Sequence, residues 1–311
     1  MSTTCNTDKY PLVSCIITTH NRLDLLKRAV ESIKRQTYPN IEVIVVDDAS
    51  DDGTKEWGEK EDIKYLHISK EDSKGGNYAR NTGIRISKGE YCAFLDDDDY
   101  WLSEKIQEQV ELAQLKESDF IYCGRRLEII EKNGSIQYVD QIPKDYYSGD
   151  LSHKILFSIP TTTSLMLVKR KALLEIGCFD ENLKFWQDYD LMIRLAQRTP
   201  IYFVPKVLAV YRISQQDKNR LTNKFDGWLT AVDYIRHKYQ NLYDKLNFWQ
   251  KIGVEIFIAN DAKQRVRNTN KLLYLKYCII SQFGKVYFLI NSILKGEFDR
   301  IFNRLKRILH L

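Results

Sequence analysis

Residues 91–101 read YCAFLDDDDYW, an apolar run that ends in four consecutive aspartates. Two unit charges about 4 Å apart repel by roughly 1 kcal/mol in water and about 4 kcal/mol near a protein surface. Four adjacent carboxylates therefore need a positive charge nearby. Alternation along an extended chain would put Asp96 and Asp98 on one side and the other two aspartates on the opposite side. Two carboxylates on one side form a site of hard oxygen ligands for Mg²⁺ or Mn²⁺. A solvated acidic turn is the plainer alternative.

The same run belongs to a regular alternation of strand-like and helix-like segments. Continuous apolar runs suit parallel strands that are covered on both faces. Apolar residues at helical spacing follow the first strand, where Asn21 or Asp24 is in position to cap the helix. A second helix is expected to open at 75–76, and another near Asp188. The alternation predicts an open α/β sheet. Its strands are expected at 13–19, 42–46, 64–68, 91–95, 120–130, 161–168 and 207–211.

Polar residues follow three of these strands at the point where each strand ends. They are Thr18 to Asn21, Asp47 and Asp48, and the four aspartates that begin at Asp96. Ligands of open α/β sheets bind at the carboxyl ends of the strands. The three clusters are therefore expected to form one binding site.

Residues 48–59, DASDDGTKEWGE, also match two other acidic motifs in part. Their spacing fits a calcium-binding EF-hand loop, but a strand precedes them where a helix is required, and Lys55 occupies a position that normally packs. Asp52 to Thr54 is similar to the nucleophile loop of haloacid-dehalogenase phosphatases, but four residues separate it from the strand. The remaining interpretation is that Asp48 accepts hydrogen bonds from a base or ribose, while 51–53 form a surface turn.

Composition limits the class of protein. The chain has 311 residues, 43% of them hydrophobic, which suffices for one large domain or two smaller ones. Its six cysteines lack metal-site spacing, and Cys15 and Cys92 lie in apolar runs, which indicates buried thiols in a reducing compartment. No signal-peptide pattern is present, so the active end is expected in the cytoplasm. Residues 215–311 hold 18 basic and 8 acidic residues, whereas 1–214 are net acidic, which indicates different partners.

Four segments, in this order, resemble the inverting, nucleotide-sugar-dependent glycosyltransferases of family 2. The resemblance covers about residues 11–214 and implies a GT-A fold: a Rossmann-like α/β architecture with a mixed, mostly parallel sheet flanked by helices. The tail lies outside it, so a catalytic domain (1–214) and a basic, helical C-terminal region (215–311) are expected. The segments are VSCIITTHNR (13–22), VIVVDDASDDGT (43–54), GGNYARNTGIRISKGEYCAFLDDDDYW (75–101) and IGCFDENLKFWQDYDLMIRLA (176–196).

The resemblance implies a role for each residue at the strand ends. Thr18 and His20 would line the nucleotide pocket, and Asp48 would hold the uracil of a UDP-sugar. Arg80 would lie near the base and diphosphate, and Asp97 near the ribose.

The resemblance also implies a divalent metal, Mn²⁺ or Mg²⁺. Asp98 would bind it directly, with Asp96 beside it. Breaking a sugar–diphosphate bond builds negative charge on the leaving diphosphate, and a metal neutralises that charge.

The second acidic motif of the family is usually Glu-Asp, and here it is Gln187-Asp188. Asp188 stands at the position of the catalytic base, which takes the proton of the acceptor hydroxyl and typically contributes roughly 10²–10⁴-fold. A base opposite the leaving group gives inversion at the anomeric carbon. The alternative is that Asp188 caps the helix that follows. The QxxRW motif and membrane-spanning helices of processive family members are absent from the sequence, which favours the addition of a single sugar.

The tail combines basic and apolar residues. Residues 262–296 contain no acid, but Lys276 and Lys285 interrupt the apolar run that a membrane span needs. Residues 298–311 repeat apolar residues at helical spacing with arginines elsewhere on the wheel, which suits a helix on an anionic membrane surface. A bundle packed on the catalytic domain is the alternative. The charge would also suit nucleic acid, but no motif supports that partner.

The sequence therefore predicts a cytoplasmic enzyme on the inner face of the cell membrane. It would transfer a sugar from a UDP-sugar to a lipid-linked or oligosaccharide acceptor in cell-surface polysaccharide biosynthesis. The alternative from another class is an inactive transferase fold that serves as a nucleotide-binding or membrane scaffold. A phosphatase or nucleotidyltransferase is a weaker enzymatic alternative.

Overall fold

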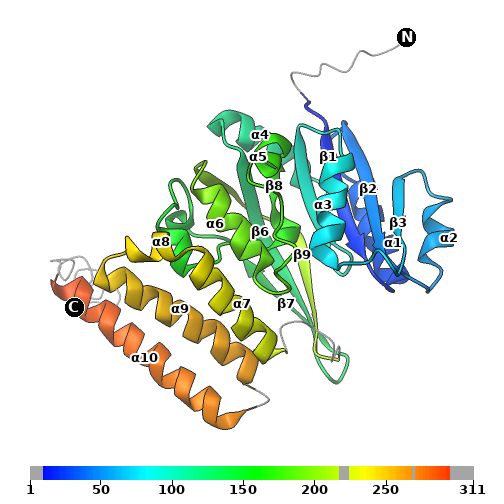
Figure 1. The fold of residues 1–311 in the computed structure, drawn as a ribbon. Coiled ribbons are helices and arrows are strands. Elements are labelled where there is room, and N and C mark those ends of the chain that lie inside the picture. The colour runs from blue at the N-terminus through cyan, green and yellow to red at the C-terminus, as the bar shows by residue number, and fades with distance from the viewer. Residues whose placement is uncertain (1–9, 217–223, 268–269, 295–311) are drawn as a thin grey trace, which may run out of the picture. The chain divides into compact units, whose positions relative to one another are not determined.

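The computed structural model describes residues 10–216, 224–267 and 270–294, with side chains up to Gln282. These residues form two compact units. The first unit holds the described residues up to 155 and 159–216, and the second holds 156–158 and those from 224 onward. The first unit is an α/β domain whose mixed sheet has helices on both faces (Figure 1). Its strands are β1 (Val13–Thr19), β2 (Ile41–Asp48), β3 (Lys64–Ile68), β4 (Tyr91–Asp96), β5 (Tyr100–Trp101), β6 (Phe120–Ile130), β7 (Ile136–Gln141), β8 (Leu167–Lys169) and β9 (Ile201–Ser214).

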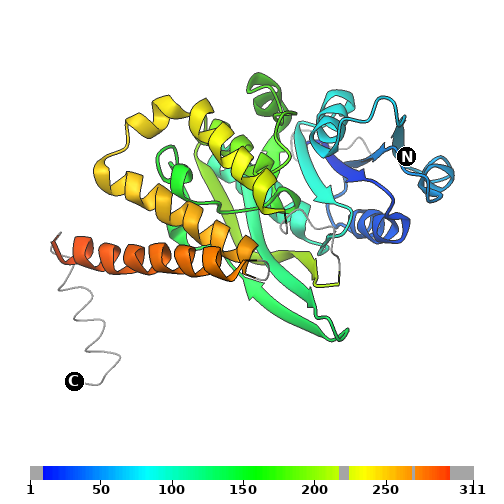
Figure 2. The same cartoon turned by 60° about the horizontal axis from the view of Figure 1, so that its bottom comes forward.

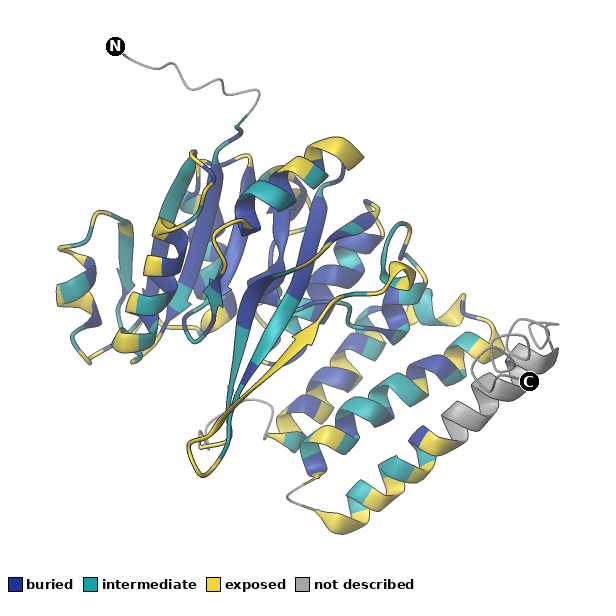
Figure 3. Ribbon diagram, turned by 180° about the vertical axis from the view of Figure 1, so that it is seen from behind, coloured by how far each residue is buried: buried dark blue, intermediate teal, exposed yellow. Residues whose placement is uncertain are grey.

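The strand order is β3-β2-β1-β4-β8-β6-β9-β5, with β7 paired to β6. The first four strands of this order run parallel, as their continuous apolar sequences predict. β8 is antiparallel to both of its neighbours. β7 is exposed along its whole length, and with β6 it forms a hairpin that extends beyond the rest of the sheet (Figures 2 and 3).

Most of the expected strands are confirmed, but the one at 161–168 is wrong. A 3₁₀ turn (Thr163–Leu165) lies in its middle, and the strand β8 begins only at Leu167. The Ser164 hydroxyl donates a hydrogen bond to Asp99 at 2.6 Å and accepts one from the backbone of Asp96 at 3.1 Å. These contacts turn the chain toward the acidic run, which apolar periodicity alone does not indicate.

Helices cover both faces of this sheet. α1 (Leu23–Lys34) and α4 (Lys105–Lys116) bury their apolar residues in one core with Cys15 and Ile17 of β1. α3 (Gly76–Ile86) packs on the other face, where a Cβ at Gly83 would lie 2.5 Å from the side chain of Ile16. The alternation of Ile16 and Ile17 thus fixes which helix covers which face. The other helices of this unit are α2 (Thr54–Gly58), α5 (Arg170–Glu175) and α6 (Gln187–Ala196), with 3₁₀ turns at Asp145–Tyr147 and Lys154–Phe157.

The start of α1 differs from the expected capping. Arg22 is the N-cap residue and makes no capping hydrogen bond through its side chain. Asp52, from the turn after β2, accepts the backbone N–H of Leu23 at 2.9 Å and so satisfies a free donor of the helix. Although partial burial acts the other way, hydrogen bonds from Thr54 and Leu23 lower the pKa of Asp52. The expected capping by Asn21 or Asp24 is wrong: the side chain of Asn21 accepts the N–H of residue 51 instead, and Asp24 lies inside the first turn of the helix.

A lysine lies in the core of the first unit. Lys105, in α4, is fully buried. Its Nζ donates to Oε1 of Gln109 at 2.6 Å and lies 4.1 Å from the centroid of the Trp101 ring. Burial lowers the pKa of Lys105 to about 8.

The second unit is helical, as predicted for the tail. Its α9 begins with a capping box in which Asn247 and Gln250 exchange side-chain and backbone hydrogen bonds. Within the described residues, no helix combines the length and the apolar content that crossing a membrane requires. The expected surface helix at 298–311 lies outside the described residues. The helices are α7 (Phe225–Lys238), α8 (Gln240–Asp244), α9 (Phe248–Val266) and α10 (Lys271–Leu294).

Candidate active site

The parallel register brings the three polar clusters to one edge of the sheet. Thr18 pairs with Asp96 of β4 on one side, and Thr19 pairs with Asp47 of β2 on the other. The structure therefore brings together the strand ends that the sequence singled out. Thr18 is partly buried at this edge.

The two aspartates at the end of β2 have different surroundings. Asp47 is fully buried and accepts hydrogen bonds from the side chains of Tyr65 and His67. Asp48 is also buried, but its Oδ1 has no hydrogen-bond partner among the described residues. A buried polar atom without a partner is costly, so Oδ1 is suited to accept an N–H from a ligand.

His20 lies next to Asp48. Its Nδ1 donates to the backbone carbonyl of Asp48 at 2.6 Å, and the ring is exposed. Asn21, in the loop after β1, and Ala49, in the loop after β2, have positive φ angles of 54° and 63°. Backbone strain of this kind concentrates at functional sites, and here it flanks the orphaned carboxylate.

The four aspartates that begin with the last residue of β4 show the expected alternation. Asp97 and Asp99 are buried, whereas Asp96 and Asp98 are partly exposed. Asp97 accepts a hydrogen bond from Thr19 at 2.8 Å. Burial raises the pKa of Asp97 to about 6.

Asp99 is not available at the edge of the sheet where the polar clusters meet. It is held by the Ser164 hydroxyl and, at 2.9 Å, by the backbone N–H of Arg212 in β9. Burial raises the pKa of Asp99 well above its usual range. Asp99 therefore anchors the loop to the sheet.

Two arginines supply the positive charge that the acidic run requires. Arg22 contacts Asp97 at 3.1 Å and Asp98 at 3.4 Å. Arg80, from α3, contacts Asp96 at 2.6 Å. Arg80 was predicted at this site, but Arg22 was not assigned a role, although its position directly after the first strand end was a usable signal.

The acidic run suits a divalent cation that a ligand helps to hold. The described residues contain no preassembled group of three metal-ligating side chains. The side chain of Asp98 is 37% exposed, and that of Asp96 is 32% exposed. Mg²⁺ usually keeps several waters and takes one or two carboxylates together with substrate phosphates. The donor set therefore fits an ion that a diphosphate completes.

Asp188 lies in the first turn of α6, whose N-cap residue is Trp186. Its Oδ1 accepts the N–H of Tyr189 at 2.9 Å, so it satisfies one free donor of the helix without being the N-cap residue. Trp186 has a positive φ of 56° and packs edge-on against Tyr189. The turn into the helix is thus strained beside Asp188.

The electrostatics of Asp188 tie it to the acidic run. Asp188 is partly exposed, yet its surroundings raise its pKa to about 6. Burial is the largest cause, and the charge of Asp96 acts in the same direction, while Arg80 opposes both. A carboxylate with a pKa near 6 is ionised at neutral pH and still basic enough to accept a proton, which suits a general base.

Two asparagines of α3 hold the loop that leads to Asp188, and neither is among the site residues predicted from the sequence. Asn77 Nδ2 donates to the carbonyls of Asp180 and Leu183 at 2.8 and 2.7 Å. Asn81 accepts the N–H of Phe179 and donates to its carbonyl, each at 2.9 Å. Their spacing of four residues puts both amides on one face of the helix, which was the available signal.

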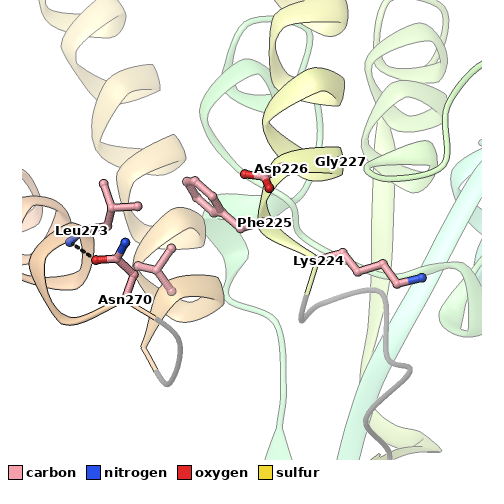
Figure 4. Close-up of a pocket in the computed structure, with 7 residues that line it drawn as sticks. Lys224, Phe225, Asp226, Gly227, Asn270 and Leu273 are labelled. Carbon is pink, nitrogen blue, oxygen red and sulfur yellow. Dashed lines mark hydrogen bonds between the residues drawn. The ribbon is translucent and has the colours of Figure 1, made fainter.

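The second unit contains a pocket of about 500 Å³ at the start of α7 (Figure 4). Asn270, on its wall, accepts the N–H of Leu273 at 3.0 Å and so caps α10. None of the site residues above belongs to this pocket. Its lining is Lys224, Phe225, Asp226, Gly227, Val266, Asn270 and Leu273.

Comparison with known proteins identifies the family. Residues 14–177 match the model of glycosyl transferase family 2. An uncharacterised glycosyltransferase of Rickettsia typhi is 36% identical over 264 residues, which cover 78% of this chain and 81% of the relative. The UDP-Glc:alpha-D-GlcNAc-diphosphoundecaprenol beta-1,3-glucosyltransferase WfaP of Escherichia coli is 41% identical over 118 residues, which cover 38% of this chain and 47% of the relative.

A solved structure shows the same fold. S. aureus TarS 1–349, in complex with UDP-GlcNAc, superposes with a TM-score of 0.56 at 17% identity and covers 92% of each chain. The predicted GT-A architecture and the family resemblance are thus confirmed. The chain belongs to glycosyl transferase family 2 and is a glycosyltransferase.

Proposed function

We propose that this glycosyltransferase moves a sugar from a UDP-sugar to a hydroxyl of a lipid-linked glycan, with inversion and with the help of a divalent metal. The observation that carries the proposal is the environment of Asp188. Its carboxylate has a pKa raised to about 6 and senses the charges of Asp96 and Arg80. Asp188 in α6 would deprotonate the acceptor, and the acidic run with its two arginines would bind the donor diphosphate.

The donor would bind at the ends of β1 and β2. The orphaned Oδ1 of Asp48 would accept the N–H of uracil, and this bond would satisfy a buried oxygen. Thr18 and His20 would line the nucleotide pocket, Asp97 would lie near the ribose, and Arg80 near the diphosphate. Each of these side chains lies at the strand edge or on α3 beside it.

Asp98, with Asp96 beside it, would hold Mn²⁺ or Mg²⁺ next to the diphosphate. The metal would neutralise the charge that develops on the leaving group. Arg22 already neutralises part of the acidic run and would remain as a second positive charge. Asp188 would take the proton of the acceptor hydroxyl from the side opposite the leaving diphosphate, which gives inversion.

The proposed acceptor is a lipid-linked glycan, and WfaP is named for an acceptor of this kind, alpha-D-GlcNAc-diphosphoundecaprenol. Exposed apolar residues of the second unit support a membrane partner. On α10, Leu272, Leu275 and Ile279 are 79%, 58% and 49% exposed and share one helix face. No acid occurs in 262–296. We therefore propose a peripheral enzyme on the cytoplasmic face of the cell membrane, active in cell-surface polysaccharide biosynthesis.

A donor screen tests the proposal. The purified protein is mixed with a panel of UDP-, GDP- and dTDP-sugars, with and without Mn²⁺, and thermal stabilisation and nucleotide release are measured. We expect a UDP-sugar to stabilise the protein and to be consumed only when metal is present. Asp98→Asn should abolish turnover and the metal-dependent part of UDP binding, whereas Asp24→Asn, an exposed acid of α1, should behave as wild type. Equal UDP affinity for wild type and Asp98→Asn across a manganese titration would exclude the metal assignment.

A further inference from the structure

Arg125, on β6, is a partly buried arginine with an unusual set of partners. Its Nε donates to Oε1 of Gln141 at 2.8 Å. Its guanidinium carbon lies 5.1 Å from the centroid of the Tyr211 ring. Within the described part of the chain Arg125 forms no ion pair, so its guanidinium faces a neutral amide and an aromatic ring.

The other arginines around the site are each paired with a carboxylate. Among the described residues, Arg125 therefore differs from these arginines in that no carboxylate forms an ion pair with it. A guanidinium presents its donors in a planar fork that matches phosphate, and it stacks readily on aromatic rings. The pairs are Arg22 with Asp97 and Asp98, Arg80 with Asp96, and both Arg28 and Arg212 with Glu128.

Strand register relates Arg125 to the acidic run. Its Cα partner on β9 is Ala209, and Ala209 pairs in turn with Trp101 of β5, two residues after Asp99. Burial lowers the pKa of Arg125, and nearby acidic groups, among them Asp99 and Asp188, act in the opposite direction. Arg125 and the base of the proposed reaction therefore sense each other's charge.

The next residue of β6 provides an internal comparison. Arg126 projects from the opposite face of the strand, because successive side chains alternate. It forms an exposed ion pair with Asp140 at 2.6 Å. One strand thus carries two adjacent arginines, of which one is neutralised on the surface and the other is not.

We propose that Arg125 binds a phosphate group of the acceptor, namely the phosphate that links the glycan to its lipid, while the acceptor hydroxyl faces Asp188. This inference rests on the proposed function. An anionic acceptor would be repelled by the acidic run unless a cation received it, and Arg125 is a cation whose charge interacts with that of Asp188. The donor diphosphate would instead be received by Arg22, Arg80 and the proposed metal at the acidic run.

The test compares two acceptors that carry the same glycan. One has a short-chain lipid diphosphate, and the other is a neutral alkyl glycoside. The variants are Arg125→Gln and, as the matched control, Arg126→Gln, which removes the same charge from the same strand. We expect Arg125→Gln to lower the ratio of kcat/KM for the diphosphate acceptor to that for the neutral acceptor at least 10-fold, and Arg126→Gln to leave the ratio unchanged. Arg125→Lys should recover only part of the loss, because it restores the charge without the fork.

Several outcomes would overturn the inference. An equal loss with both acceptors would make Arg125 a structural residue, and a raised KM for the UDP-sugar would assign it to the donor. Titration of the full-length protein with farnesyl diphosphate in the presence of UDP separates this inference from the proposed function. If the wild type transfers no sugar but binds farnesyl diphosphate at least 10-fold more tightly than Arg125→Gln, the phosphate site stands and the proposed function fails. Equal affinities of the wild type and Arg125→Gln for farnesyl diphosphate would exclude Arg125 as a phosphate-binding residue.

Discussion

At the end of β4 the side chain of Asp97 is 7% exposed and accepts a hydrogen bond from Thr19, while that of its neighbour Asp98 is 37% exposed. The two residues are chemically identical, so only their surroundings distinguish a buried, paired carboxylate from a more exposed one that can bind an ion. The same holds for Asp47 and Asp48, of which one is saturated with donors and the other keeps a buried oxygen free. Roles at this site follow from hydrogen-bond partners more than from residue type.

The first prediction at this scale concerns Asp188. As a general base it acts in the transition state, so Asp188→Asn should lower kcat by at least about 10²-fold while UDP-sugar affinity stays near that of wild type. Steady-state kinetics and titration calorimetry measure the two quantities. Asp190→Asn is unsuitable as a control because Asp190 pairs with Arg194 in the core, so Asp24→Asn, at an exposed acid of α1, serves instead. Retained turnover, or loss of the fold, would return Asp188 to a purely capping role.

A second prediction follows from the pKa of the same carboxyl group. Only its ionised form accepts a proton, so the wild-type kcat at saturating substrates should fall as the pH drops below about 6. The charge of Asp96 helps to raise this pKa, so Asp96→Asn should move the acid limb of the profile to lower pH. The full pH profiles of kcat for both proteins test this shift. A limb that stays in place would mean that another group controls it.

At the scale of the element, the sequence predicts strands and helices with a periodic apolar pattern well. It predicts poorly those segments whose conformation depends on a single long-range hydrogen bond. The parallel strands have long apolar runs, and their polar ends converge as expected because parallel register leaves no other arrangement. The strand expected at 161–168 fails because the Ser164 hydroxyl turns toward Asp99. Asp52 caps a helix 29 residues away in sequence. Such long-range hydrogen bonds leave no periodic signal.

The contact between α3 and the loop before Asp188 leads to an element-scale prediction. Asn81→Ala would leave the backbone N–H and carbonyl of Phe179 without partners, and a small displacement of a catalytic group can cost roughly 10²-fold in rate. We therefore expect kcat to fall at least about 10-fold while the KM for the UDP-sugar changes little. Asn182→Ala, in the same loop, removes only a local bond to Asp180 and should be neutral. Equal effects of the two substitutions would contradict a positioning role.

At the scale of the whole molecule, an α/β unit that is net acidic accompanies a basic helical unit. Attraction to an anionic leaflet amounts to about 1 kcal/mol per basic residue near the surface and is screened by salt. We expect the full-length protein to sediment with phosphatidylglycerol vesicles but not with phosphatidylcholine vesicles, and high salt to weaken the binding. Deletion of residues 298–311 should reduce sedimentation while nucleotide-sugar hydrolysis persists. If the shortened chain loses UDP binding instead, the segment is part of the packed structure.

The buried Lys105 lowers the stability of the folded protein at neutral pH. Its pKa of about 8 lies below the ordinary 10.5, so between these values the unfolded chain binds a proton that the folded chain does not. The contribution of Lys105 to stability therefore rises with pH across that window, and below pH 8 its burial is a liability of up to about 3 kcal/mol. Lys105→Met, which keeps the volume, should raise the unfolding free energy most at neutral pH and lose this advantage toward pH 10.5. Denaturant titrations of both proteins at several pH values would reveal the trend, and they would identify an alkaline buffer as the better one for storing the enzyme.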